Sequence, residues 1–374
     1  MNFKKSLRTY TMVFALFAIW AIFEVQTDGA FLQARNLSNL LRQMSVTSIL
    51  SIGMVLIIVA GHIDLSVGSV VCFLGAILTV ANTKMGYSPS VSVAIALSAG
   101  ALIGLMNGYL LSYQRIPSFI VTLGGMMAFR GAAMMVTKNE TIPLEAGWIQ
   151  TMGTGYVNAK AGWIICIFSL MVTCLALIWG RQSEIKSGLE STPLSKFILK
   201  LLGLAFIVLS SMAVLASYEG IPIPVLIMIG LMIIVYLAAT RTTWGRHIYA
   251  IGGNSDAAFL SGINIKFRTL SIYVLMGLLS AIGGIILTAR VGSASPDSGQ
   301  LLELDAIASC VIGGTSLMGG KGSVLGAILG ALVMESLNNG MSLASIEPFW
   351  QYIVKGVVLV AAVWADMLSQ DVKG

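Results

Sequence analysis

The chain has 374 residues, of which 57% are hydrophobic and only 10% are charged, and its mean hydropathy is +0.89. A soluble domain carries about 25% charged residues, so this composition excludes a water-soluble globular protein. The net charge of +6 comes from basic residues scattered over short polar stretches. They form no patch interleaved with aromatic residues, which argues against nucleic-acid binding.

Apolar runs long enough to cross a bilayer recur along the whole chain. A hydrocarbon core of about 30 Å needs about 20 predominantly apolar residues per helix. Such runs lie at about 10–27, 44–61, 65–83, 91–113, 119–137, 161–180, 196–217, 224–240, 269–290, 304–319, 321–339 and 347–366. Several are short or broken by glycine, so ten full spans fit as well as twelve. The sequence predicts an all-α, polytopic transmembrane helical bundle of about 10–12 membrane segments, some re-entrant or broken, in a single transmembrane domain over residues 1–374.

The distribution of basic residues sets the orientation. The first apolar run follows a basic start and has no small-residue cleavage site after it, so we interpret it as a retained first helix. With that end inside, thirteen Lys and Arg residues fall in inner segments and six in outer ones. Basic residues accumulate on the cytoplasmic side of membrane proteins, so both termini are expected there. The two longest connections are an outer one at about 138–160 and an inner one at about 241–268.

Residues for nucleotide or metal chemistry are not recognisable. The nearest approach to a phosphate-binding P-loop, Gly319-Gly320-Lys321-Gly322, lacks the first glycine and the final Ser or Thr of that motif. The two histidines, His62 and His247, are far apart, and the four cysteines lack the spacing of a zinc site. We therefore expect no cofactor, no metal and no enzymatic activity in this chain.

Four polar residues within or beside the apolar runs are candidates for a translocation path or a helix break. Asp64 lies near a predicted helix end, where capping of the next helix is the simpler interpretation, and Lys355 also lies near a helix end, where its side chain can snorkel. Arg130 and Glu335 lie deeper, and they could pair with each other or line a water-filled cavity. The candidate path residues are Asp64, Asn107, Arg130 and Glu335. Intramembrane ionisable residues of this kind also leave open an ion-coupled secondary transporter.

Four ordered motifs carry a family resemblance over nearly the whole chain. They are Asn36–Gln43 with Gly61–Ser69; Ile116–Gly124 with Ala128–Gly131; Gly245–Asn254 with Ala257–Ile263; and Glu303–Ala308 with Ile312–Leu317 and Gly319–Ser323. This set resembles the permeases of ribose/xylose-type bacterial ABC importers, which are related to branched-chain amino-acid permeases. The additional stretch from about 181 to 217 is typical of the xylose-type members, to which the chain is most similar.

The resemblance implies a function and a set of partners. A chain of this family is a permease subunit in the bacterial inner membrane that moves a monosaccharide, here a pentose such as D-xylose, from periplasm to cytoplasm. A separate ATPase would drive transport, a periplasmic binding protein would deliver the sugar, and a second copy of the permease would complete a homodimer. A permease of the same family for another small polar solute is the alternative within this class, and the ion-coupled carrier is the alternative outside it.

The resemblance also implies where the partners dock. The inner connection is expected to hold a short helix that enters a groove on the ATPase, capped by Asn254 or Ser255, with Ala257, Ala258 and Leu260 as a small apolar face. The expected coupling residues are Gly252, Gly253, Asn254, Ala257, Ala258, Leu260, Ser261 and Gly262. On the outer side, the acidic segment from Arg290 to Asp305 is expected to contact the binding protein. Its candidate contacts are Asp297, Glu303 and Asp305.

Overall fold

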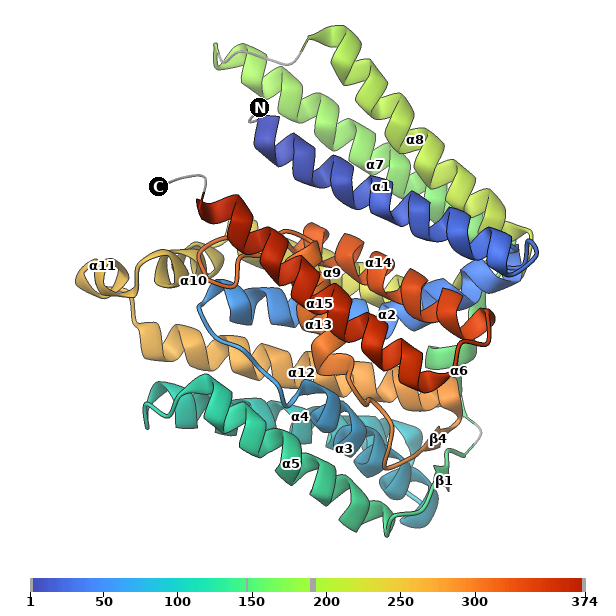
Figure 1. The fold of residues 1–374 in the computed structure, drawn as a ribbon, viewed down its shortest axis with the longest axis vertical. Coiled ribbons are helices and arrows are strands. Elements are labelled where there is room, and N and C mark those ends of the chain that lie inside the picture. The colour runs from blue at the N-terminus through green and yellow to red at the C-terminus, as the bar shows by residue number, and fades with distance from the viewer. Residues whose placement is uncertain (1–2, 146, 189–192, 372–374) are drawn as a thin grey trace.

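A computed structural model of the chain describes residues 3–145, 147–188 and 193–371 (Figure 1). The long helices are α1 (Phe3–Gln26), α2 (Ala34–Val59), α3 (Val67–Thr79) with its π-helical continuation η1 (Val80–Lys84), α4 (Pro89–Ser112), α5 (Ser118–Thr137), α7 (Ala159–Lys186), α8 (Leu194–Ala216), α9 (Ile223–Arg241), α12 (Ile265–Val291), α14 (Val324–Leu343) and α15 (Pro348–Asp371). The shorter helices are α6 (Trp148–Thr154), α10 (Thr243–Gly253), α11 (Ser255–Leu260) and α13 (Leu302–Ile312). The strands have two residues each: β1 (Ile142–Pro143), β2 (Tyr156–Val157), β3 (Ile221–Pro222) and β4 (Ser293–Ala294).

Each of the twelve apolar runs overlaps one helix, in the predicted order. Among the described residues, ten helices are long and apolar enough to cross a membrane, and α1 contributes a shorter apolar stretch at Met12–Gln26. The run at 304–319 corresponds to α13, which has only 11 residues and cannot span a bilayer. The prediction of an all-α polytopic membrane protein with a broken segment is confirmed.

The two ends of the bundle carry different structures. Figure 1 shows α10 and α11 at one end and α6, β1 and β4 at the other. Helix α1 begins, and helix α15 ends, at the end that holds α10 and α11 (Figure 1). This arrangement agrees with the distribution of basic residues, which makes that end the cytoplasmic one. We call it the inner end and the opposite one the outer end.

Helices α2 and α12 form the centre of the bundle. In α2, 89% of the most apolar 18-residue window is buried, whereas in α15 none of that window is buried. Helix α12 packs closely on α4 because Gly100, Gly104 and Gly108 recur every fourth residue on the facing side of α4. A Cβ at Gly100 would collide with the carbonyl oxygen of Gly277 on α12. Small residues at this spacing let two membrane helices approach with their backbones in contact.

Two non-helical segments enter the bundle, one from its inner end and one from its outer end. Residues 60–66 run inward from the inner end of α2 to the start of α3, and residues 295–301 run from β4 to the start of α13 (Figure 1). Both α3 and α13 therefore begin inside the bundle. The two starts meet, because a Cβ at Gly68 on α3 would collide with the Gly299 carbonyl and the Glu303 carboxylate. Such backbone at membrane depth is tolerated where protein surrounds it.

Short strand pairs tie the outer connections together. Strand β1 pairs antiparallel with β4, with Ile142 opposite Ala294, and strand β2 pairs antiparallel with β3, with Tyr156 opposite Pro222. The Leu144 amide also donates to the Gly292 carbonyl at 2.9 Å. The outer connection at 138–160 is thereby fastened to the segment that leads into α13 and to the segment that leads into α9.

Candidate functional site

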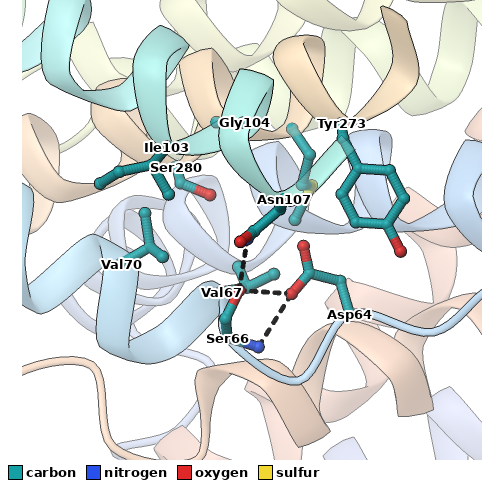
Figure 2. A pocket seen from close by; sticks show the side chains of 11 residues that line it. Asp64, Ser66, Val67, Val70, Ile103, Gly104, Asn107, Tyr273 and Ser280 are labelled. Atoms are coloured by element: carbon teal, nitrogen blue, oxygen red, sulfur yellow. Dashed lines mark hydrogen bonds between the residues drawn. The ribbon is translucent and has the colours of Figure 1, made fainter. Parts of the chain in front are cut away.

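The buried start of α3 is organised by Asp64. Its Oδ1 accepts hydrogen bonds from the backbone amide of Ser66 at 2.8 Å and from the Ser66 hydroxyl at 2.6 Å. Asn107 on α4 donates in turn to the Ser66 hydroxyl at 3.4 Å (Figure 2). Asp64 is 3% exposed. The carboxylate thus holds the amide and hydroxyl of Ser66, the residue just before the first turn of α3, and does not itself cap that helix.

Asp64 and Asn107 line one small cavity between α3, α4 and α12. Tyr273 and Ser280 of α12 and Gly104 of α4 line it as well (Figure 2). The cavity measures about 10 Å³, which is room for about one water. Within the described part of the chain, the Asn107 Oδ1 and the Tyr273 hydroxyl have no hydrogen-bond partner. The cavity has a few polar groups in a mainly apolar lining and is too small for a solute larger than water in this conformation.

Arg130 on α5 holds the second entering segment. Its Nη1 donates to the carbonyl oxygens of Pro296 and Ser298, both at 2.8 Å. Arg130 therefore does not pair with Glu335. Such a pair was one of the two arrangements that the sequence left open, the other being a water-filled cavity. By satisfying two carbonyls at once, the guanidinium fixes the non-helical backbone that leads into α13.

Glu335 lies on the other side of α13 and lines a second, larger cavity. This cavity measures about 200 Å³ and lies between α2, α12, α13, α14 and α15. The Thr47 hydroxyl donates a short hydrogen bond to the Glu335 carboxylate. Asp305 lines the same cavity and pairs with Lys355, whose Nζ lies 2.9 Å from Oδ2. Lys355 is thus held in an ion pair inside the bundle, whereas the sequence suggested a lysine snorkelling from a helix end.

The acidic outer segment differs from its expected arrangement. Glu303 and Asp305 are 8% and 3% exposed because α13 begins inside the bundle. Their side chains are covered in this conformation, and contact of these two residues with a binding protein stays a prediction. Acidic residues in a first helical turn interact favourably with the free amides there, which gives these two a structural role. Asp297 is exposed and remains a candidate contact.

The inner connection forms two helices that project from the bundle (Figure 1). Helix α11 covers Ser255–Leu260, and the side chain of Asn254 accepts the Ala257 amide at 2.9 Å, which is the capping expected for a helix here. Ser261 follows the last helical residue, and Gly262 then turns the chain with φ of +81°. A positive φ of this kind favours glycine.

Helix α10 is fastened to the membrane helices at several points. It buries Gly245, Ile248 and Ile251, which recur every third residue on one face. Trp244 donates to the Ser271 hydroxyl on α12 at 2.8 Å. Tyr249 donates to the Gly322 carbonyl at 3.0 Å, and burial raises the pKa of its phenol, so this donor stays protonated at neutral pH. A force applied to α10 would therefore reach α12 and the segment before α14.

The exposed face of α11 holds two of the three residues expected from the sequence, Ala257 and Leu260. Ala258 is buried at 4% exposure and packs against its own chain. Phe259 and Leu260 are 69% and 84% exposed. Leu260 and Ala257 are exposed as expected, whereas Ala258 faces the bundle and Phe259 adds a large exposed side chain that was not expected. The side of a short helix that packs on the bundle is not encoded in its local sequence.

The expected coupling glycines differ in their surroundings. Gly252 lies against the carbonyl of Val59 and the amide of Gly320, whereas nothing lies within 4 Å of a Cβ built on Gly253. Gly252 thus joins the end of α10 to the end of α2.

Among the described residues, no three His, Cys, Asp or Glu side chains come together as a metal site.

Comparison with known proteins places this architecture in a family. The family described as "Branched-chain amino acid transport system / permease component" matches residues 36–363. The chain is 46% identical over 361 residues to the xylose transport system permease protein XylH of Haemophilus influenzae, covering 96% of each chain. It is 44% identical to XylH of Escherichia coli, covering 98% of this chain and 93% of the relative. The ribose import permease protein RbsC of Escherichia coli is 37% identical, with 91% and 88% covered.

No solved structure matches the chain. The family match, together with ten helices able to cross a membrane among the described residues, confirms a multi-pass protein of the bacterial inner membrane. The match also confirms the resemblance drawn from the four motifs. The chain belongs to the family of permease components related to branched-chain amino acid transport systems, within the group of xylose and ribose permeases.

Proposed function

We propose that this chain is the membrane-spanning subunit of an ABC importer that carries a pentose, D-xylose, from the periplasm to the cytoplasm. The support for D-xylose is the similarity to xylose transport system permeases over 96% of both chains. ATP hydrolysis would occur in a separate ATPase, and a periplasmic sugar-binding protein would deliver the sugar. A second copy of the chain would complete the translocation path.

The observation that carries the proposal is the construction of α10 and α11. Helix α11 presents two large exposed apolar side chains, Phe259 and Leu260, at the inner end. Helix α10 connects it rigidly to α2, α12 and the segment before α14. A docked ATPase that displaces α11 and α10 could therefore move α2, α12 and the segment before α14 together. An ion-coupled carrier would need no exposed helices of this kind.

The intramembrane charges give the ion-coupled alternative little support. Arg130 is engaged by two carbonyls, and Lys355 is paired with Asp305. Glu335 accepts a hydrogen bond from Thr47. Each of these groups thus has a structural partner, whereas a proton or sodium relay needs groups that exchange their ligand during transport.

Reconstitution tests the proposal. The permease is placed in liposomes with the partner ATPase and sugar-binding protein, and uptake of labelled D-xylose is measured. We expect uptake that requires ATP on the ATPase side and continues when proton and sodium gradients are collapsed. Uptake that follows an imposed ion gradient without ATP would contradict the proposal.

A further inference from the structure

The cavity beside α13 has the lining of a solute-binding site. Eight of its twelve lining residues are polar or charged. They come from five helices and from the segment before α13, and they are Gln43, Thr47, Arg290, Gln300, Asp305, Glu335, Asn338 and Lys355. Its apolar wall is limited to Val46, Leu287 and Leu302. A cavity this polar inside a membrane bundle is costly unless something polar occupies it.

Several lining atoms lack a partner. Within the described part of the chain, the Nη1 of Arg290, the Oδ1 of Asp305 and the Oδ1 of Asn338 are buried and make no hydrogen bond. Asp305 is 3% exposed, yet only its Oδ2 is used, by Lys355 at 2.9 Å and by Asn338 at 3.2 Å. Buried polar atoms are normally satisfied. One donor and two acceptors among the residues that line the cavity are therefore left without a partner.

The charges favour a neutral ligand. Two basic and two acidic residues line the cavity, so their formal charges cancel. Lys355 and Asp305 are already paired, and a charged ligand would have to break that pair. A sugar hydroxyl both donates and accepts, so it can satisfy Arg290 and Asn338 or Asp305 without altering the charge balance. Three apolar residues offer little surface for an aliphatic side chain.

The size and depth also fit a monosaccharide. The cavity measures about 200 Å³, against about 10 Å³ for the cavity at Asp64, which has room for one water, so it can hold a molecule of several waters' size. Gln43 is the tenth residue of α2 and Lys355 the eighth of α15, counted from their outer ends. At 1.5 Å per residue they lie about 10–14 Å below that end. A sugar released at the outer surface would meet this cavity before the inner half of the bundle.

We propose that this cavity is a pentose-binding site of the permease itself, in which Asn338, Asp305 and Arg290 bind ring hydroxyls on the way through the membrane. The proposal rests on the proposed function, because it assigns the transported sugar to a place in this chain. The site is distinct from the small cavity at Asp64, whose lining residues it does not share.

Saturation-transfer NMR tests the proposal. The full-length permease is placed in lipid nanodiscs without ATPase or binding protein, and D-xylose is added. The variants are Asn338→Ala and Gln43→Ala, which truncate cavity side chains and keep both members of the Lys355–Asp305 ion pair; Asn338→Ala also removes the hydrogen bond from Asn338 to Asp305, whereas Gln43→Ala leaves it in place. Asn82→Ala is the control, since Asn82 is a buried asparagine in η1 that does not line the cavity.

We expect a D-xylose signal from the wild type and from Asn82→Ala, and at least a fivefold weaker signal from both cavity variants. Absence of a wild-type signal, equal signals from all variants, or a signal from L-valine in place of D-xylose would overturn the proposal. The ATP-dependent uptake described above is measured on the same preparation with its partners. If that uptake succeeds while the permease alone binds no sugar, the site fails and the proposed function stands. If that uptake fails, the proposed function fails.

Discussion

Gly252, at the end of α10, lies against the carbonyl oxygen of Val59, the last residue of α2. The same carbonyl accepts a hydrogen bond from the Gly320 amide at 2.8 Å. Five residues after Val59 the chain reaches Asp64, which organises the buried start of α3. A displacement of α10 at the inner end therefore acts directly on the backbone that leads to the middle of the bundle.

Gly252→Ala is expected to destabilise the protein. The new Cβ would overlap the Val59 carbonyl, and overpacking of this kind costs about 1–3 kcal/mol. Gly253→Ala is the matched control, because a Cβ there meets nothing within 4 Å. Thermal unfolding of the purified variants measures the difference. Equal melting temperatures for the two variants would show that α10 does not depend on this close approach.

Asp64→Ala is expected to weaken the start of α3. It removes the acceptor of the Ser66 amide and hydroxyl, and a hydrogen bond to a charged group contributes about 1.5–3 kcal/mol. Asp64→Asn keeps an oxygen at the same place and should retain most of the stability. The two variants are compared by thermal unfolding and by uptake in the reconstituted importer. If Asp64→Asn unfolds as early as Asp64→Ala, the negative charge rather than the acceptor stabilises the helix start.

Leu260→Asp is expected to abolish ATPase association without lowering expression. Leu260 is 84% exposed, so the folded permease loses little, whereas an interface that buries it would receive an unpaired charge. Ile185→Asp, at the inner end of α7 and 52% exposed, is the control. Co-purification of the ATPase with each variant gives the result. Retention of the ATPase by Leu260→Asp would exclude α11 as the docking helix.

Asp297→Lys is expected to weaken docking of the sugar-binding protein in a salt-dependent way. Asp297 is exposed on the segment before α13, and interface charges mainly set the rate and register of association. Asp28→Lys, another exposed acidic residue near the outer end, is the control. Association rates at low and high salt measure the effect. Unchanged association at low salt would leave this segment as a connection only.

Hydrophobic length is a local property, and for this reason the sequence predicts the spans well. A run of apolar residues needs no knowledge of its neighbours to be placed in a bilayer. The glycines in the short run at 304–319 also indicated a broken membrane segment, and the helix there, α13, has 11 residues. The capping of α11 by Asn254 was predictable for the same local reason.

Contacts between distant segments were not predictable in this way. Asp305 and Lys355 are 50 residues apart, and Thr47 and Glu335 are 288 apart, so nothing local indicates either pair. The acids after Arg290 suggested an outer surface because three carboxylates in a short stretch usually face water. Only the burial of the start of α13 shows that Glu303 and Asp305 belong to the interior. The face of α11 that packs on the bundle is hidden from the sequence in the same way.

Helices α7 and α8 pack mainly on each other, and only 11% of each apolar window is buried. Natural selection therefore requires little more of most of their side chains than that they are hydrophobic. A hairpin under so loose a constraint can drift, lengthen or be lost during evolution while the glycine-packed centre stays fixed. Divergence among permeases of this group should accordingly concentrate in this hairpin, and grafting it between relatives should leave the centre of the bundle undisturbed.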